Sequence, residues 1–245
     1  MQTHDIDYRD GTVNLRGYLV FDEKIAEQRP GVVVFHEGLG LGDFVMARAR
    51  MLSEIGYVAL AADMFGERRQ ARNLQEVAKL VGDLRNRPET LRARGRAALT
   101  TLAALPQVDV HRMAAIGFCF GGSVALELAR DGADLKAVVS FHGVLATTTP
   151  AASGKVKASV LVCTGADDPL APPEQVKAFE NEMRAAHVRD WQVISYGNTL
   201  HGFTNPAADG SMMRTARYSA QADRRAWASM RSLFDEVFGD DVCQA

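Results

Sequence analysis

Short apolar runs alternate with longer segments of helical periodicity along most of the chain, and this alternation constrains the fold most. The apolar runs are nearly continuous and rich in β-branched residues, as in Gly31–Phe35, which favours strands buried on both faces of a parallel sheet. Strands that alternate with helices are typical of βαβ units. The pattern predicts an α/β fold, with a mostly parallel central sheet and helices on both faces.

The predicted elements extend over most of the 245 residues. The predicted strands are an edge strand at Val13–Val20, then Gly31–Phe35, Tyr57–Ala61, Met113–Phe118, Ala137–Phe141, Val160–Thr164 and Trp191–Tyr196. The predicted helices are Phe44–Ile55, Leu74–Leu84, Glu89–Ala104, Gly121–Arg130, Pro173–Ala186 and Ala222–Phe238. We find no internal repeat and no linker rich in Pro, Gly or Ser, so residues 1–245 are predicted to form one domain.

Charge and cysteine content exclude several classes of protein. The 28 basic and 30 acidic residues give a formal net charge of -2, which provides no excess positive charge to neutralise a nucleic-acid backbone. The longest apolar run, residues 57–62, is too short to cross a bilayer. Cys119, Cys163 and Cys243 have neither disulfide-framework nor metal-knuckle spacing. We expect a cytoplasmic monomer or homodimer with a small-molecule substrate, and neither a nucleic-acid nor a membrane partner.

Cys119 lies in a glycine-flanked motif between a predicted strand and a predicted helix. The sequence Gly117-Phe-Cys119-Phe-Gly121 fits the G-x-nucleophile-x-G elbow, with cysteine as the nucleophile. Such a tight, strained turn requires flanking residues without side chains. The amino terminus of the following helix would favour a thiolate and a developing oxyanion. A buried structural cysteine is the alternative, but the motif and its partners favour the nucleophile.

An acid and a base follow later strands in the order that α/β-hydrolases use. Asp168 fits a G-x-x-D-x-x-x-P pattern, whereas the adjacent Asp167 is predicted to stabilise the turn. His201 stands in a His-Gly-Phe sequence after the last predicted strand. Carboxyl ends of parallel strands meet at one edge of the sheet. We therefore predict that Asp168 and His201 lie beside Cys119.

The loop His36–Gly40 follows the strand that begins at Gly31. In this architecture the loop supplies one oxyanion-hole N–H, and the residue after the nucleophile supplies the other. We predict these donors at Gly38 and Phe120. Glu37 could approach the thiol, where its carboxylate would disfavour the charged form of the sulfur. Alternatively, Glu37 only anchors the loop.

Two further patterns have simple explanations. His36, His142 and His201 each end or follow a predicted strand, but they lack the HExxH or CxxC spacing of a metal site. The arginine-rich stretch Arg85–Arg96 could bind an anion, but it fits the solvated face of an amphipathic helix better. We predict no metal and no anion site from these residues.

The sequence resembles the dienelactone hydrolase family within the α/β-hydrolase superfamily, over about residues 31–238. The matching segments are His36–Gly40, Ala62–Gly66, Gly117–Gly122, Asp168 with Pro172, His201–Phe203 and the helix around Ala226-Trp227. The resemblance implies a Cys119-His201-Asp168 triad, Glu37 in contact with the resting thiol, and oxyanion donors at Gly38 and Phe120. It also implies hydrolysis of enol-lactones or other small esters without a cofactor.

The chain departs from the family pattern where a carboxylated substrate would bind. The family places an arginine four residues after the catalytic histidine, and here that position is Asn205. Loss of a bidentate carboxylate clamp weakens binding of an anionic substrate, so we do not expect the carboxylated dienelactone itself as substrate. The residues predicted to contact substrate are Arg68, Arg69, Phe65, Phe203 and Asn205.

The predicted function is that of a cysteine-dependent hydrolase of small esters or lactones. Activated aryl esters and uncharged phosphotriesters would suit a pocket that lacks the second arginine. The alternative is a non-catalytic protein of the same fold that binds a ligand or acts in regulation.

Overall fold

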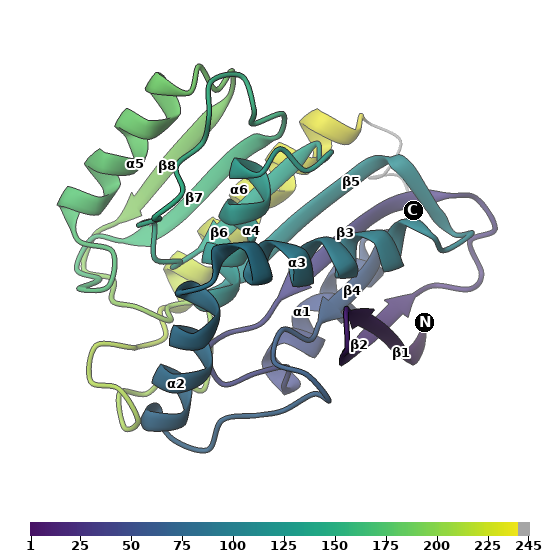
Figure 1. Cartoon of the computed structure of the whole chain (residues 1–245), viewed down its shortest axis with the longest axis horizontal. Coiled ribbons are helices and arrows are strands. Elements are labelled where there is room, and N and C mark those ends of the chain that lie inside the picture. Colours follow the sequence, from purple (N-terminus) through teal and green to yellow (C-terminus); the bar gives the residue numbers. More distant parts are fainter. Residues whose placement is uncertain (240–245) are drawn as a thin grey trace.

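The computed structural model describes residues 1–239, and the strands within this range form one eight-stranded sheet (Figure 1). The strands are β1 (Gln2–Asp10), β2 (Val13–Phe21), β3 (Arg29–Phe35), β4 (Val58–Ala62), β5 (Val108–Phe118), β6 (Ala137–Phe141), β7 (Ser159–Gly165) and β8 (Trp191–Tyr196). Their spatial order is β1-β2-β4-β3-β5-β6-β7-β8. Strands β4, β3, β5, β6, β7 and β8 run parallel to one another, while β2 pairs antiparallel with both β1 and β4.

Helices cover both faces of the sheet. They are α1 (Asp43–Glu54), α2 (Leu74–Arg85), α3 (Pro88–Ala103), α4 (Phe120–Arg130), α5 (Pro173–Ala185) and α6 (Ala220–Phe238). One buried apolar cluster joins the sheet to α2, α3, α4 and α5, and a second cluster joins its other face to α1 and α6. Figure 1 shows the same division, with α3 and α4 in front of the sheet and α1 and α6 behind it. The predicted α/β class, the mostly parallel sheet and the two helical layers are confirmed.

Strand β1 is the one strand in residues 1–239 that the sequence pattern did not predict. It pairs along its whole length with β2. The segment Val13–Val20, predicted as the edge strand, is therefore part of the second strand of the sheet. Most residues of β1 are exposed, and an exposed edge strand has no buried face to produce apolar alternation. The antiparallel pair β1–β2 extends the sheet beyond β4, on the side away from β8.

The six parallel strands bring six loops to one edge of the sheet. The loops that follow β3, β4, β5, β6, β7 and β8 begin with His36, Asp63, Cys119, His142, Ala166 and Gly197. All of these strands point the same way, so their carboxyl ends lie side by side. Among residues 1–239, no helix combines the length and the apolar character needed to span a membrane. Cys243 lies outside the described residues.

Candidate active site

Cys119 occupies a strained turn between β5 and α4. Its φ of 53° and ψ of -114° lie in a region that non-glycine residues rarely adopt. A side chain on Gly117 would overlap the carbonyl of Gly121, and one on Gly121 would overlap the carbonyl of Phe35. The two glycines of the motif are therefore required for close backbone approach, and the turn directs the half-buried Cys119 to the start of α4.

His201 and Asp168 form a buried pair at the same edge. The distance between His201 Nδ1 and Asp168 Oδ2 is 2.8 Å, and the two side chains are 4% and 0% exposed. The other carboxylate oxygen, Asp168 Oδ1, accepts a hydrogen bond of 2.8 Å from the N–H of Leu170. Asp167 is exposed, and its N–H donates to the carbonyl of Thr199. The structure thus joins His201 to Asp168 and leaves Asp167 in the turn.

The second ring nitrogen of His201 faces the nucleophile. His201 Nε2 is buried without a hydrogen bond of good geometry, yet the Cys119 sulfur is close enough to affect its protonation. Burial acts to lower the pKa of His201, but the Cys119 thiolate and the Asp168 carboxylate outweigh it and raise the pKa to about 10. This arrangement favours a protonated imidazole whenever the sulfur is ionised.

The loop after β3 carries Gly38, one of the two predicted oxyanion donors. The carbonyl of Glu37 accepts hydrogen bonds from His36 Nδ1 at 2.6 Å and from the N–H of Gly40 at 3.1 Å. A trans peptide directs its N–H opposite to its C=O, so the N–H of Gly38 points away from both donors. Phe120 is the first residue of α4, where the backbone N–H has no partner within the helix. The assignment of these two N–H groups as oxyanion donors stays a prediction.

Glu37 binds Asn205, which the sequence analysis assigned to substrate. Asn205 Nδ2 donates to Glu37 Oε2 at 2.8 Å, and the Asn205 N–H closes a turn onto the carbonyl of Gly202. Burial raises the pKa of Glu37 to about 7, although the hydrogen bond from Asn205 and the charge of His201 oppose the shift. Within residues 1–239 no hydrogen bond joins Glu37 to Cys119. The geometry supports the role of loop anchor.

The two arginines predicted to bind substrate have different surroundings, and their contact with substrate stays a prediction. The Arg68 guanidinium contacts the Asp5 carboxylate at 2.6 Å and the carbonyl of Gly17 at 2.7 Å, which are in β1 and β2. Arg69 is exposed, and its N–H donates to the carbonyl of Gly66. Asp63 holds this loop, because its carboxylate accepts the N–H groups of four residues: Arg16, Phe65, Gly66 and Arg68. These hydrogen bonds hold the loop after β4 in place against β2.

The two phenylalanines have different environments. Phe65 is partly exposed and stacks on Phe120, with 5.7 Å between ring centroids. It therefore borders the oxyanion donor, where a substrate could touch it. Phe203 is completely buried and packs against His142 and Tyr196. Phe203 supports the histidine loop from the core and offers no surface to a substrate.

Sequence reasoning missed two residues near the nucleophile. Arg85, at the end of α2, donates to Ser123 Oγ at 3.2 Å. Burial lowers the pKa of Arg85, and the charge of Cys119 opposes this shift. His142, after β6, is completely buried, and its Nδ1 accepts the N–H of Cys119 at 3.1 Å. No spacing rule marks either residue, because both contacts join segments far apart in the chain.

The arginine-rich stretch is only partly the solvated face that its composition predicts, because Arg87 and Arg96 are exposed but Arg92 and Arg94 are largely buried. Arg92 pairs with Glu127 at 2.7 Å, and Arg94 donates to the carbonyl of Met64 at 2.6 Å. These two side chains are 16% and 12% exposed. The cause is that α3 packs on the sheet beside α4, so Arg92 and Arg94 meet carboxylates and carbonyls rather than water.

Cys163 is the other cysteine among the described residues. Cys163, in the middle of β7, is completely buried, and burial raises the pKa of its thiol to about 12. Among residues 1–239, no group of three or more His, Cys, Asp or Glu side chains could hold a metal ion. An open hollow of about 660 Å³ lies at the start of α2, lined by Arg72–Gln75, Ser211 and Met212, and none of these residues belongs to the cluster around Cys119.

Comparison with known proteins gives concordant results. The dienelactone hydrolase family matches residues 15–238. A solved structure named m3DLH is 46% identical, with a TM-score of 0.94, and the match covers 97% of this chain and 99% of that chain. A dienelactone hydrolase-like promiscuous phosphotriesterase from metagenomic libraries is 44% identical, with a TM-score of 0.91 and the same coverage. A Yersinia pestis relative named "Putative carboxymethylenebutenolidase" is 25% identical, over 96% of this chain and 91% of its own length.

The matches agree with the order of strands and with the loops at the sheet edge. The solved structures are similar along the whole sheet, so the expected α/β-hydrolase fold is confirmed. The family match begins in β2 and ends in α6, and it includes each loop of the cluster around Cys119. This protein is a hydrolase that belongs to the dienelactone hydrolase family.

Proposed function

We propose that this chain, acting as one catalytic domain, is a cysteine hydrolase that cleaves small carboxylic esters or lactones. One observation carries the proposal: Cys119 sits on a strained turn at the start of α4, and a buried His201–Asp168 pair faces its sulfur. A strained backbone persists only where the surroundings enforce it, and such sites are often functional. A non-catalytic binding protein would require neither the strain nor the buried ion pair.

Before acylation, the proton of the Cys119 thiol has already moved to His201 Nε2. The raised pKa of His201 favours a resting ion pair, in which the imidazole already holds this proton. The sulfur bonds to the carbonyl carbon, and the carbonyl electron pair moves onto oxygen, where the N–H groups of Gly38 and Phe120 stabilise it. The tetrahedral intermediate then expels the leaving oxygen, which takes the proton from His201. A thioester on Cys119 remains.

Deacylation requires His201 to act as a base, and thioester formation itself makes this possible. The Cys119 thiolate is the strongest of the influences that raise the pKa of His201, and it is absent from the acyl-enzyme. Burial then lowers the pKa, so neutral His201 can take a proton from water while the oxygen adds to the thioester. Collapse releases the carboxylic acid and restores the ion pair. Asp168 holds the imidazole in the required tautomer throughout.

Arg85 adds a positive charge near the nucleophile. Its guanidinium is fixed by Ser123 Oγ, and the N–H of Ser123 donates to the carbonyl of Cys119 at 3.3 Å. The charge therefore stays near the sulfur when the acyl group is transferred. We assign Arg85 to the stabilisation of negative charge on the thiolate and on the tetrahedral intermediate.

The substrate is expected to be small and uncharged around position 205. Where the family has an arginine, Asn205 is occupied by Glu37, and the Arg68 guanidinium is engaged with β1 and β2. Neither residue is free to clamp a substrate carboxylate. These contacts support neutral esters and lactones rather than a carboxylated dienelactone.

The experiment that tests the proposal compares the cysteines. Cys119→Ala should abolish hydrolysis of a chromogenic short-chain aryl ester, while Cys163→Ala should retain it, because Cys163 is buried in β7. Mass spectrometry of the wild-type enzyme, quenched during turnover, should show the acyl group on the peptide that contains Cys119. Full activity in Cys119→Ala, or an acyl group on another residue, would refute the mechanism.

A second candidate activity is the hydrolysis of uncharged phosphotriesters. It is favoured by the absence of a free carboxylate clamp at Asn205 and by the likeness to a solved promiscuous phosphotriesterase. The sulfur would displace an aryl alkoxide from phosphorus, and water would then cleave the phosphorylated Cys119. With an activated aryl phosphotriester we expect release of the aryl alcohol and a phosphoryl adduct on Cys119. Absence of both would remove this activity.

A further inference from the structure

His142 is a buried residue at the sheet edge for which the proposed mechanism has no role. It follows β6, whose neighbours are β5, which precedes Cys119, and β7, which precedes Asp168. Its side chain is completely buried, and its backbone has a positive φ of 42°. Histidine adopts this left-handed region more often than most residues. The conformation turns the ring into the space between the nucleophile and the catalytic histidine.

Both ring nitrogens of His142 bind parts of the proposed active site. His142 Nδ1 accepts the backbone N–H of Cys119 at 3.1 Å, which this N–H shares with the carbonyl of Phe141 at 3.0 Å. His142 Nε2 lies 2.7 Å from Thr204 Oγ1. A backbone N–H can only donate, so Nδ1 carries no proton. The proton of the neutral ring is therefore on Nε2, which donates to the hydroxyl of Thr204. His142 thus bridges the nucleophile turn and the loop that carries His201.

The ring of His142 is kept neutral. Burial holds the pKa of His142 well below its usual range, and the charges of His201 and Arg48 act in the same direction. The His201 ring meets the ring of His142 edge-on, with 5.2 Å between centroids. A second proton on His142 would place an N–H against the Cys119 N–H, which would keep only the carbonyl of Phe141 as an acceptor. It would also place two cations in contact.

The far end of the bridge is anchored by a buried ion pair. Thr204 is 1% exposed, and its carbonyl accepts a hydrogen bond of 2.6 Å from Arg48. The same guanidinium contacts both carboxylate oxygens of Asp223, at 2.7 and 2.9 Å. It also lies over the ring of Phe118, the residue before the nucleophile. One rigid group therefore supports the nucleophile turn and the loop after His201.

We propose that His142 is a positioning residue that holds the Cys119 turn against the His201 loop and so keeps the sulfur and His201 Nε2 at reacting distance. The inference rests on the proposed function, because it assigns a partner to the same nucleophile. The strained backbone of Cys119 needs such support, since a misplacement of about 1 Å can lower a rate on the order of 100-fold. A residue that only fills the core would affect stability and not the chemical step.

Three substitutions separate positioning from packing. His142→Phe keeps a ring and removes both hydrogen bonds. His142→Asn keeps an acceptor near the Nδ1 position and tolerates a positive φ, but it does not reach Thr204. Thr204→Val removes the hydroxyl and keeps the shape, with Thr204→Ser as the matched control that retains the hydroxyl.

The measurements are kcat and KM for an aryl ester and the rate of Cys119 alkylation by iodoacetamide, with denaturant unfolding as the check on folding. We expect His142→Phe to lower kcat at least ~100-fold with KM little changed. His142→Asn should recover part of this loss, and Thr204→Val should lose more activity than Thr204→Ser. A folded His142→Phe enzyme with kcat within about threefold of wild type would overturn the inference. If His142→Phe does not fold, equal kcat values for Thr204→Val and Thr204→Ser would overturn it instead.

The Cys119→Ala variant distinguishes the two possible failures. An active Cys119→Ala enzyme would refute the proposed function, whatever the His142 variants do. An inactive Cys119→Ala enzyme together with a fully active His142→Phe enzyme would refute only the positioning role.

Discussion

Replacement of Asp168 by asparagine should abolish most of the activity, because the structure fixes how the new amide must point. Asp168 Oδ1 accepts the N–H of Leu170, and Oδ2 faces His201 Nδ1. An asparagine would keep its carbonyl oxygen toward Leu170, because the reverse orientation leaves a buried N–H without an acceptor, at a cost of about 1–3 kcal/mol. Its NH₂ group would then donate to His201 Nδ1.

This donation forces the wrong tautomer on His201. With Nδ1 as an acceptor, the proton of the neutral ring lies on Nε2, which can no longer accept the proton of the Cys119 thiol. Loss of the carboxylate also removes one of the influences that raise the pKa of His201. Replacement of a triad acid by its amide lowers turnover on the order of 10⁴-fold, which corresponds to about 5.5 kcal/mol of activation free energy.

The matched control is Asp167→Asn. Asp167 is exposed, and its backbone alone bonds to Thr199, so we expect its kcat/KM within about tenfold of wild type. The assay is kcat/KM on a chromogenic aryl ester, with thermal unfolding of each variant measured alongside. An NMR titration of His201 should show a lower pKa in Asp168→Asn. Activity of Asp168→Asn within tenfold of wild type, or a larger loss in Asp167→Asn, would refute the reasoning.

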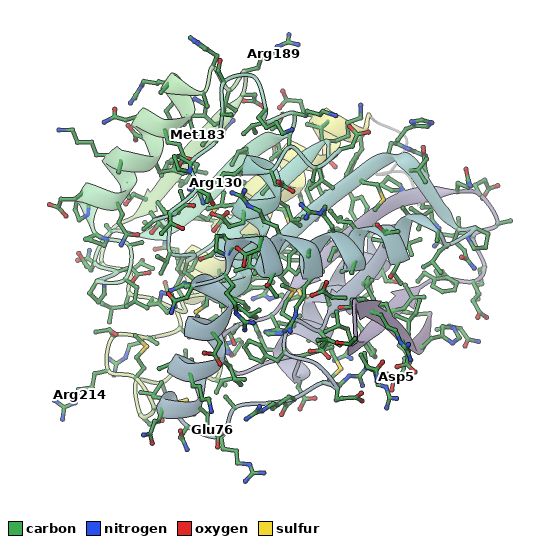
Figure 2. The ribbon with its side chains drawn as sticks, viewed as in Figure 1. Asp5, Glu76, Arg130, Met183, Arg189 and Arg214 are labelled. Atoms are coloured by element: carbon green, nitrogen blue, oxygen red, sulfur yellow. The ribbon has the colours of Figure 1, made fainter. Side chains whose placement is uncertain are left out.

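Three further predictions follow from buried charges. Burial raises the pKa of Glu37 to about 7, so the stability that this carboxyl contributes is complete below about pH 4.5 and is lost as pH rises through 7. The free energy of unfolding of Glu37→Gln, relative to that of wild type, should therefore increase by about 2 kcal/mol between pH 5 and pH 8. Equal pH profiles of stability for the two proteins would contradict this. Because Asn205 holds Glu37, the pH profiles of Cys119 alkylation should coincide in wild type and Glu37→Gln; faster alkylation of the variant would show instead that Glu37 restrains the thiol. Arg130 lies inside the molecule near Met183, where it binds the buried carboxylates of Glu127 and Glu182. Arg189 extends outward instead (Figure 2). Arg130→Met should destabilise by about 3–5 kcal/mol and Arg189→Met by less than about 0.5 kcal/mol in denaturant unfolding, and a similar effect of both would refute the role of the ion pairs.

The sequence predicts most of this fold because the buried strands contain little except apolar residues. Every residue of β3, β4 and β6 is buried, so each of these strands is recognisable in the sequence as an apolar run. The exposed β1 has no such signal, since its position comes from backbone pairing with β2. The catalytic candidates are also predictable, because Cys119 and Gly38 stand within three residues of a strand end.

The residues that surround the nucleophile are less predictable, for a physical reason. His142 is 23 positions from Cys119, and Asn205 is 168 positions from Glu37. Such contacts depend on which strands are neighbours and on how loops cross the sheet edge. No local spacing encodes them, so Asn205 was assigned to substrate and Arg85 to solvent.

The order of the strands explains why the histidine loop needs several anchors. His201 follows β8, while Cys119 follows β5, with β6 and β7 between them. At about 4.8 Å per strand, the loop must bring the imidazole back across roughly 14 Å of sheet edge. The edge provides a contact at each intermediate strand: Asp168 after β7 binds the His201 ring, and His142 after β6 binds Thr204. Each contact restricts the motion of the histidine loop, and the contact at β6 lies one strand closer to Cys119 than the contact at β7. In the proposed mechanism, these contacts at β6 and β7 keep the imidazole of His201 aligned with the sulfur of Cys119.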